Sequence, residues 1–240
     1  MNRFSDQGIV LSVRPHGEGG AVVHLLTQNH GKCGGYVNGA QSSGRLRSLL
    51  QPGNIVSCEW QAKSEGALGR YDLELEKDVS AVIFDDPNAI HAVQSACSLI
   101  DMFLPEREIY FDLYQGTEAF LDIIKTSQWP AVYILWEVAF LKEMGYGIDL
   151  SKCAVTDETK NLTHVSPKTG RAVCEREAEP YKSKLLEIPH FMQGEAFQEG
   201  DIETGLALTG HFMIHRLLQH STFQAMPEPR IQLEKTFQKE

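Results

Sequence analysis

The sequence lacks a long apolar run. None of its apolar stretches approaches the ~20 residues that a membrane-spanning helix needs, and even the apolar segment 133–141 contains Glu137. The first eight residues, MNRFSDQG, contain no apolar core of a signal peptide. These absences argue against a membrane protein and against a secreted one, so we expect a cytoplasmic location.

Cysteine is also scarce. The 240 residues include five cysteines, at positions 33, 58, 97, 153 and 174. A secreted disulfide scaffold is short and dense in cysteine, so we expect reduced thiols. Free cysteine packs as a small hydrophobic residue, which is the role we predict for Cys33, Cys58 and Cys97.

Positive charge is in deficit, and it is unevenly distributed. The formal net charge of −10 argues against a generally basic nucleic-acid-binding protein. Residues 1–71, however, hold seven Lys or Arg against four Asp or Glu, a balance of +3. Residues 81–150 hold three basic and eleven acidic residues, a balance of −8. Such asymmetry predicts separate roles for the two segments.

Recognisable catalytic motifs are missing. The glycines at 17–20 and 34–35 match no phosphate-binding loop, and we interpret them as a turn and a bend. No G-x-S-x-G sequence is present, and no cysteine has a protease-like context. His211 and His215 have the spacing of two zinc ligands, but Phe212 replaces the glutamate of H-E-x-x-H. We predict a protein that is not an enzyme; a metal-dependent enzyme is an alternative that metal analysis would decide.

Residues 1–80 have the pattern of a small β-barrel. With 42% hydrophobic residues the chain can bury a core. Short β-branched or alternating segments are separated by Gly- and Pro-containing turns, which predicts strands. The expected strands cover residues 8–14, 21–27, 32–38, 55–62 and 70–76. Five short strands that close on themselves fit the OB-fold.

Residues 81–240 change to a helical period. Asp86 and Pro87 form a helix start, a capping residue followed by an early proline. Helices are expected over 89–104, 108–125, 129–144 and 204–220, near 181 and after 227, while 151–174 looks irregular. The fold class is therefore α+β, with a barrel followed by an α-helical domain.

The basic residues of the barrel are candidate DNA contacts. Small barrels bind nucleic acid by combining a positive groove with aromatic stacking platforms. The candidate phosphate contacts are Arg14, Lys32, Arg45, Arg47, Lys63 and Arg70. Tyr36 is the candidate stacking ring, with Trp60 and Tyr71 as further possibilities. The alternative, a solvated basic surface over core aromatics, stays open.

The order and spacing of several segments resemble the RecO family of bacterial recombination mediators, over nearly the whole chain. The segments are residues 8–20 (GIVLSVRPHGEGG), 23–27, 31, 50–53 (LQPG), 136–141, 145–146, 148–150, 153–155, 165–173 (VSPKTGRAV) and 226–230 (MPEPR). The resemblance implies an N-terminal OB-fold and a C-terminal helical domain. It also implies that the protein binds single- and double-stranded DNA, anneals complementary strands, and with RecR helps RecA replace single-strand-binding protein (SSB) in DNA repair and recombination, in association with the nucleoid.

The resemblance fails at the zinc finger that such proteins often carry within the helical domain. Cys153 and Cys174 stand at the first positions of two C-x-x-C pairs, but Thr156 and Glu177 stand at the second positions. Two thiolates cannot complete a four-cysteine site. We therefore expect no zinc and interpret residues 151–178 as a degenerate zinc-finger-like loop, held by packing of residues such as Leu162.

A second partner site follows from the same resemblance. RecO-like proteins contact the acidic tail of SSB, whose receptor should be an apolar pocket with basic side chains around it. The candidate residues are Lys182, Lys184 and Arg216. The net charge leaves a further alternative open, a protein-interaction adaptor that engages DNA only together with RecR.

Overall fold

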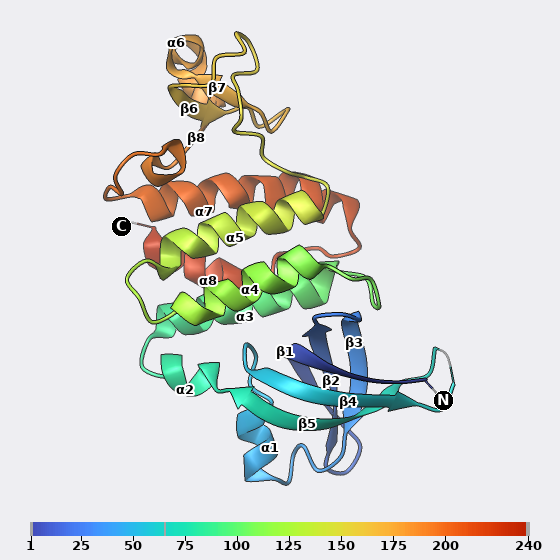
Figure 1. The fold of residues 1–240 in the computed structure, drawn as a ribbon. Coiled ribbons are helices and arrows are strands. Elements are labelled where there is room, and N and C mark those ends of the chain that lie inside the picture. The colour runs from blue at the N-terminus through green and yellow to red at the C-terminus, as the bar shows by residue number, and fades with distance from the viewer. Residues whose placement is uncertain (1, 65, 239–240) are drawn as a thin grey trace. The chain divides into compact units, whose positions relative to one another are not determined.

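The N-terminal strands form a closed barrel. The computed structural model describes residues 2–64 and 66–238. The strands are β1 (Asn2–His16), β2 (Gly20–Thr27), β3 (Gly31–Val37), β4 (Ile55–Ala62) and β5 (Gly69–Lys77) (Figure 1). They close in the order β1-β2-β3-β5-β4, with antiparallel neighbours except β3 and β5, which are parallel. The predicted five-stranded OB-fold is confirmed.

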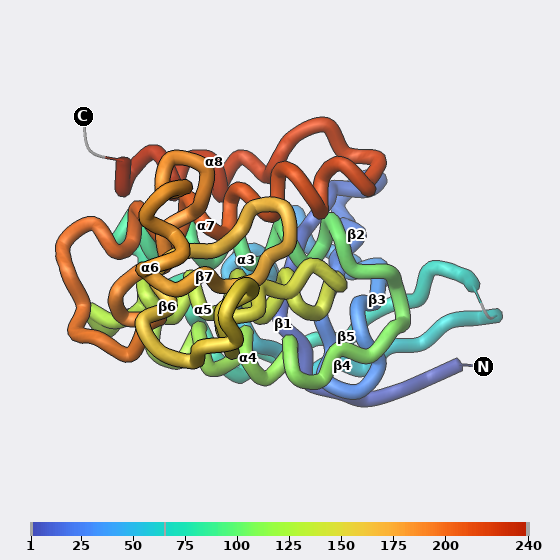
Figure 2. The backbone as a smooth tube through the Cα atoms, turned by 90° about the horizontal axis from the view of Figure 1, so that it is seen from above, coloured from blue at the N-terminus to red at the C-terminus, as the bar shows by residue number. Residues whose placement is uncertain are grey.

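Strand β1 is longer than the predicted segment 8–14 and has two partners. Its first half pairs with β4, from Asn2 opposite Ala62, and its second half pairs with β2. A register shift between Val10 and Ser12 separates the halves, and such a bulge bends a strand. Figure 2 shows the start of β1 running beside the β4–β5 connection at one edge of the barrel. The polar opening of the sequence conceals this strand from a hydrophobic-pattern analysis.

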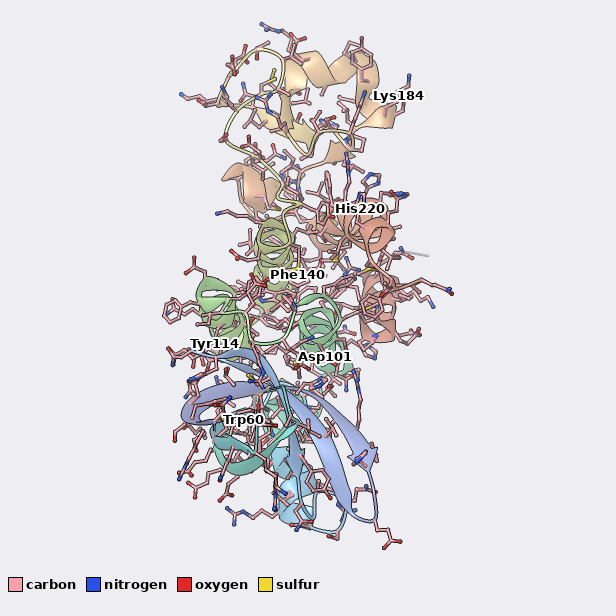
Figure 3. All side chains as sticks on the ribbon, turned by 90° about the vertical axis from the view of Figure 1, so that its right-hand side faces the viewer. Trp60, Asp101, Tyr114, Phe140, Lys184 and His220 are labelled. Atoms are coloured by element: carbon pink, nitrogen blue, oxygen red, sulfur yellow. The ribbon has the colours of Figure 1, made fainter. Side chains whose placement is uncertain are left out.

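Trp60 and Tyr71 belong to the barrel core, which corrects their reading as possible stacking platforms. Trp60 is 1% exposed, and its indole Nε1 donates to the carbonyl oxygen of Gly34 at 3.0 Å (Figure 3). The Tyr71 hydroxyl donates to the carbonyl oxygen of Cys33 at 3.0 Å. A Cβ atom at Gly69 would lie 2.1 Å from the Trp60 ring, so glycine is required there.

Helices accompany the barrel in the same compact unit. They are α1 (Gly44–Leu49), α2 (Val79–Ile83), α3 (Pro87–Phe103) and α4 (Phe111–Ile123). The Asp86 carboxylate accepts from the backbone N–H groups of Asn88 and Ala89 at 3.0 and 3.1 Å, which satisfies donors at the start of α3. The helix start predicted at Asp86 and Pro87 is present.

Backbone contacts divide the chain into two compact units. One runs to Thr126 and includes Pro227–Arg230; the other comprises Ser127–Met226 and the residues from Ile231 onward. The strands of the barrel end at Lys77, but α2, α3 and α4 lie in the same unit as the barrel. The division into domains 1–80 and 81–240 stays a prediction.

The second unit contains α5 (Trp129–Glu143) and α7 (Asp201–Phe212), which continues through a π-helical turn at Met213–Leu217. A buried carboxylate joins the two helices: Glu137 on α5 accepts hydrogen bonds from the Tyr133 and Thr209 hydroxyls. Helix α8 (Glu228–Phe237) follows near the end of the chain.

Residues 151–178 are more regular than expected. They contain β6 (Leu162–Val165), β7 (Ala172–Cys174) and α6 (Glu175–Ala178), and β8 (Leu186–Glu187) completes a three-stranded sheet with the order β7-β6-β8. We call residues 151–187 the sheet module. Strands of two to four residues are too short to produce a recognisable alternation. Among the described residues, no helix is long and apolar enough to span a membrane.

Candidate nucleic-acid interface

One row of paired positions crosses every strand of the barrel. Consecutive partners in it are Arg14, Val22, Tyr36, Arg70, Gln61 and Arg3, on β1, β2, β3, β5, β4 and again β1. The row begins and ends on β1 because β1 pairs with both β2 and β4. Directly paired residues point to the same face of a sheet. We call this set the cross-strand row.

The cross-strand row lies on the outer face of the barrel. Arg3, Gln61 and Arg70 are exposed, whereas Ala62 and Tyr71, the next residues along β4 and β5, are buried. Strands lie about 4.8 Å apart, so Tyr36 and Arg70 are immediate neighbours and Arg3 is two strands from Arg70. The register therefore places a tyrosine ring and several guanidinium groups on one continuous surface.

A hollow of about 760 Å³ opens beside this row, at the β4–β5 loop. We call it the loop hollow. Its cationic lining comes from Arg3, Lys63 and Arg70, and its acidic lining from Glu59 and Asp72. Arg3 is 2.5 Å from Glu59, with both side chains more than half exposed. Exposed ion pairs contribute only about 0–1 kcal/mol, so Arg3 can exchange this partner for a phosphate.

Helix α1 supplies the border of the loop hollow. The Ser43 hydroxyl accepts from the backbone N–H of Leu46 at 3.3 Å and caps the helix. Leu46 lines the hollow, while Arg45 and Arg47 on either side of it are exposed. Both arginines are thus available beside the hollow, although neither lines it.

Lys32 does not belong to this surface. It is buried, and its ammonium donates to the carbonyl oxygen of Asp101 at 2.6 Å. Burial lowers the pKa of Lys32, and the carboxylates of Asp101 and Glu106 offset this only in part. Because its ammonium is enclosed, we leave Lys32 out of the proposed phosphate contacts.

Arg14 is shared between the cross-strand row and a second cluster. Its guanidinium donates to Asp101 at 2.8 Å, and His24 Nδ1 lies 2.6 Å from the other oxygen of Asp101. Burial raises the pKa of Asp101, but the hydrogen bond and charge of His24, together with Lys32, hold it below its ordinary value. We call Asp101, Arg14, His24 and Lys32 the Asp101 cluster.

A serine, Ser12, lies beside the Asp101 cluster but does not form a catalytic triad with it. Ser12 Oγ lies 3.4 Å from His24 Nδ1, the same nitrogen that contacts Asp101. A triad needs the serine and the carboxylate on opposite nitrogens of the imidazole. The arrangement therefore joins β1, β2 and α3 and gives no activated nucleophile.

The two cysteines of the sheet module are close together and buried. Cys153 Sγ accepts from the backbone N–H of Cys174 at 3.3 Å and that of Val155 at 3.5 Å. Burial raises the pKa of Cys153, but hydrogen bonds from Thr156 and from these N–H groups outweigh it and lower the pKa to about 6. This geometry stabilises a thiolate.

The remaining positions do not fit the zinc ion that the family resemblance implies. Thr156 Oγ1 lies 3.7 Å from Cys174 Sγ, and the Glu177 carboxylate pairs with Arg176 at 3.1 Å. Structural zinc is held by four cysteine or histidine ligands. Within residues 2–64 and 66–238, no group of three or more His, Cys, Asp or Glu residues is placed to hold a metal.

The three residues proposed for the SSB tail have different surroundings. Lys182 pairs with Glu179 at 2.6 Å. Arg216 donates to the carbonyl oxygens of Pro167 and Lys168, so it braces the turn between β6 and β7. Lys184 lies on the sheet module, apart from His220 near the end of the helical segment that carries Arg216 (Figure 3). Lys182 lines a hollow of about 310 Å³ whose lining includes neither Lys184 nor Arg216.

Arg3 was missed in the sequence because it precedes the first recognisable strand. The signal that could reveal it is the alternation of Arg3 and Ser5 with Phe4, which continues the strand toward the N-terminus. The segment is otherwise polar, and a polar strand gives a weak hydrophobic pattern.

Comparison with known proteins identifies relatives over most of the chain. Residues 1–76 match the family described as "Recombination protein O N terminal", and residues 85–221 match "Recombination protein O C terminal". A protein named DNA repair protein RecO from Rhodospirillum centenum is 44% identical over 227 residues, covering 92% of this chain and 90% of the relative. Proteins of the same name from Caulobacter vibrioides and Rhodospirillum rubrum are 42% and 38% identical, covering 88% and 89% of this chain and 87% and 88% of the relatives.

Proposed function

The chain belongs to the RecO family of DNA repair proteins, and on this premise we propose that it binds DNA on the outer face of its barrel. Family membership supports a role in DNA repair and recombination. The observation that carries the DNA-binding proposal is the cross-strand row, which sets Tyr36 beside Arg70 and leads to the loop hollow with Arg3 and Lys63.

The location of this surface agrees with how the fold binds nucleic acids in general. OB-folds bind oligonucleotides on the face of strands 2 and 3 and at the loops after strands 1 and 4. The cross-strand row crosses β2 and β3, and the loop hollow adjoins the loop after β4. Phosphates would contact Arg3, Arg14, Arg45, Arg47, Lys63 and Arg70. Base identity would matter little, because backbone contacts and stacking tolerate any base.

Binding of this kind supports strand annealing without a catalytic group. The protein would hold two complementary strands near each other, and base pairing would supply the driving free energy. We propose that it contacts single- and double-stranded DNA, acts with RecR in loading RecA onto SSB-covered DNA, and works in the cytoplasm at the nucleoid. Neither zinc nor catalysis is part of this proposal.

A fluorescence-anisotropy titration tests the DNA-binding step. A labelled single-stranded oligonucleotide is titrated with the protein at several salt concentrations, with and without RecR. We expect binding by the protein alone that weakens with salt, since each phosphate contact on a single strand adds about −0.7 to the log–log slope. Arg45→Ala/Arg47→Ala should lower the DNA affinity and reduce the magnitude of the salt slope. If both quantities are unchanged, α1 is not part of the DNA-binding surface.

The adaptor alternative predicts a different titration. It is favoured by the net charge of −10 and by the excess of eight acidic residues over residues 81–150. Binding that appears only when RecR is present would support it and would transfer the search for DNA contacts to the joint surface. Binding by the protein alone would exclude it.

The SSB-tail site stays a proposal with Lys182, Lys184 and Arg216 as its residues. A labelled peptide of acidic sequence with apolar terminal residues is titrated with the protein and with the Lys182→Ala/Lys184→Ala/Arg216→Ala variant. Equal affinities would overturn the assignment. Because Arg216 braces the turn after β6, the variant Lys182→Ala/Lys184→Ala is measured alongside to separate loss of charge from loss of that turn.

A further inference from the structure

A second hollow, of about 440 Å³, shares Arg3 and Trp60 with the loop hollow. We call it the stacked hollow. Phe4, His30, Arg107 and Ile109 are among its other lining residues. In a chain with a net charge of −10, this lining contains two arginines and no carboxylate. The charge of its walls favours an anion.

The floor of the stacked hollow is a stack of planar groups. Phe4 stacks on His30, with ring centroids 3.9 Å apart and planes inclined by 10°. Phe4 also stacks on Trp60, at 5.1 Å and 17°. The Arg107 guanidinium carbon lies 4.7 Å from the Trp60 ring centroid, within the range of a cation–π contact. The rings of Phe4, His30 and Trp60 are thus nearly parallel, and Arg107 from a separate loop lies over Trp60.

His30 is held in this stack from behind. Its Nδ1 lies 2.7 Å from the Asp6 carboxylate, which is 2% exposed. Asp6 also accepts from the backbone N–H and the side-chain amide of Asn29, each at 2.9 Å. The His30 side chain remains 40% exposed. Its ring is therefore oriented by the protein and still open to a ligand.

Arg107 has an unfavourable backbone conformation, which sets the position of its side chain. Its φ of 65° lies in the left-handed region, which non-glycine residues rarely adopt. Its N–H donates to the carbonyl oxygen of Lys32 at 2.8 Å, and this docks the loop on the edge of β3. Gly31 permits the approach, since a Cβ there would lie 2.0 Å from the Glu108 carbonyl oxygen. Strained residues of this kind cluster at functional sites.

Packing alone accounts for only part of this arrangement. Burial of Trp60 and partial burial of Phe4 are what a barrel core requires. A core does not require a guanidinium over the indole, an isoleucine that is 58% exposed at the rim, or a lining without carboxylates. An aromatic surface combined with cations is the composition of single-strand binding sites.

We propose that the stacked hollow holds one unpaired nucleobase of a bound DNA strand, stacked on the half-exposed His30 ring, with the adjacent phosphates on Arg3 and Arg107. The proposal rests on the DNA-binding function above. It adds the site on the protein that receives one base of the bound strand. Arg3 connects this hollow to the loop hollow, so a single strand can pass from one to the other.

The test compares an oligothymidylate with an abasic oligonucleotide of equal length. Both carry the same phosphates, but only the first can stack. We expect the protein to bind oligothymidylate about tenfold more tightly, since stacking of one base contributes about 1–3 kcal/mol. His30→Ala should lose most of this preference, and His30→Phe should retain it because a planar ring remains.

Two further variants separate the contribution of the Arg107 charge from that of the His30 ring. Arg107→Gly keeps a residue that accepts a positive φ, removes the guanidinium, and should weaken binding of both oligonucleotides. His220→Ala removes an exposed histidine that stacks on Tyr146 outside the barrel unit and should change neither affinity. Circular dichroism and urea unfolding confirm that each variant is folded.

The outcomes distinguish the two proposals. If the protein alone binds neither oligonucleotide, the proposed DNA-binding function fails. If it binds both with equal affinity, or if His30→Ala keeps the preference, the function stands and the nucleobase site is wrong. A preference that is lost in His30→Ala and kept in His30→Phe supports the site.

Discussion

Two groups of basic side chains lie on the same barrel unit, and they have opposite surroundings. The Asp101 cluster collects Arg14, His24 and Lys32 around a carboxylate that is 8% exposed. The loop hollow presents Arg3, Lys63 and Arg70 to solvent, and the only ion pair among them in the described part of the chain is the exposed one with Glu59.

The difference shows that burial of the carboxylate partner decides whether a cation stabilises the fold or is available to bind DNA. A buried carboxylate must be neutralised where it lies, so its cations are committed to the fold. Cations with exposed partners lose little when they change them, so they can bind phosphates. Arg14 stands between the two groups, because it reaches Asp101 while its side chain stays 67% exposed.

Removing Asp101 should produce the largest effect, and the effect should be on stability. In Asp101→Ala, His24 loses its carboxylate partner and the buried Lys32 ammonium loses a neighbouring negative charge, although Lys32 keeps its bond to the backbone carbonyl of residue 101. We expect a cost of about 2–4 kcal/mol of the free energy of unfolding. Urea denaturation measures this. Asp72→Ala, on an exposed position of β5, is the control and should cost under about 0.5 kcal/mol. Equal costs would mean that the cluster does not hold the fold.

Removing two cations of the loop hollow should have the next largest effect, on DNA alone. Lys63→Ala/Arg70→Ala should weaken single-strand binding about tenfold at moderate salt and reduce the magnitude of the salt slope by about 1.4, at about 0.7 per contact. Anisotropy titrations measure both quantities. Lys125→Ala/Lys142→Ala removes the same charge from exposed positions outside the barrel and should leave the slope unchanged. A parallel decrease in both variants would indicate an effect of net charge only.

The two groups should also differ in how they respond to acid. The pKa of Asp101 is lower in the folded protein than in the unfolded chain, where it is about 3.9. Its contribution to stability is therefore complete above that value and is lost as the pH falls through the folded pKa. The difference in unfolding free energy between wild type and Asp101→Asn should narrow below about pH 4. A gap that stays constant down to pH 3 would contradict the assignment.

Removing Glu59, the ion-pair partner of Arg3, should give the smallest effect on DNA affinity. Glu59→Gln removes its exposed partner and one of the two acids of the loop hollow, so DNA affinity should rise about twofold with a stability change within about 0.5 kcal/mol. Glu74→Gln, an exposed acid on β5 that does not line the hollow, is the matched control. If both substitutions raise affinity equally, the local role of Arg3 is not supported.

The parts of the fold that follow from local chemistry were predictable. β-branched or alternating segments separated by Gly- and Pro-containing turns indicate β2, β3, β4 and β5, and the aspartate–proline pair at 86–87 indicates the start of α3. The first half of β1 was not recognised because its side chains are polar, and β6 and β7 were not recognised because they are too short.

The candidate site was predictable only as a list of residues. Composition singled out Tyr36, Arg70 and Lys63, but the same reasoning included Lys32, which is buried, and omitted Arg3 and Arg107. These residues are far apart in the sequence, so their proximity cannot be read from it. Arg3 and Arg70 are both paired with Gln61 on β4, and Arg107, in a loop after α3, lies over Trp60.

The sequence by itself determined the succession of a barrel and helices, the excess of positive charge in the first 71 residues, and the presence of Thr156 and Glu177 three residues after Cys153 and Cys174. These features depend on residue type and on spacing along the chain, which the sequence contains. Only the tertiary structure decided which cations face solvent, which surround Asp101, and that Arg107 lies over Trp60. These placements depend on strand register and burial, and both arise from contacts between residues that are distant in the chain.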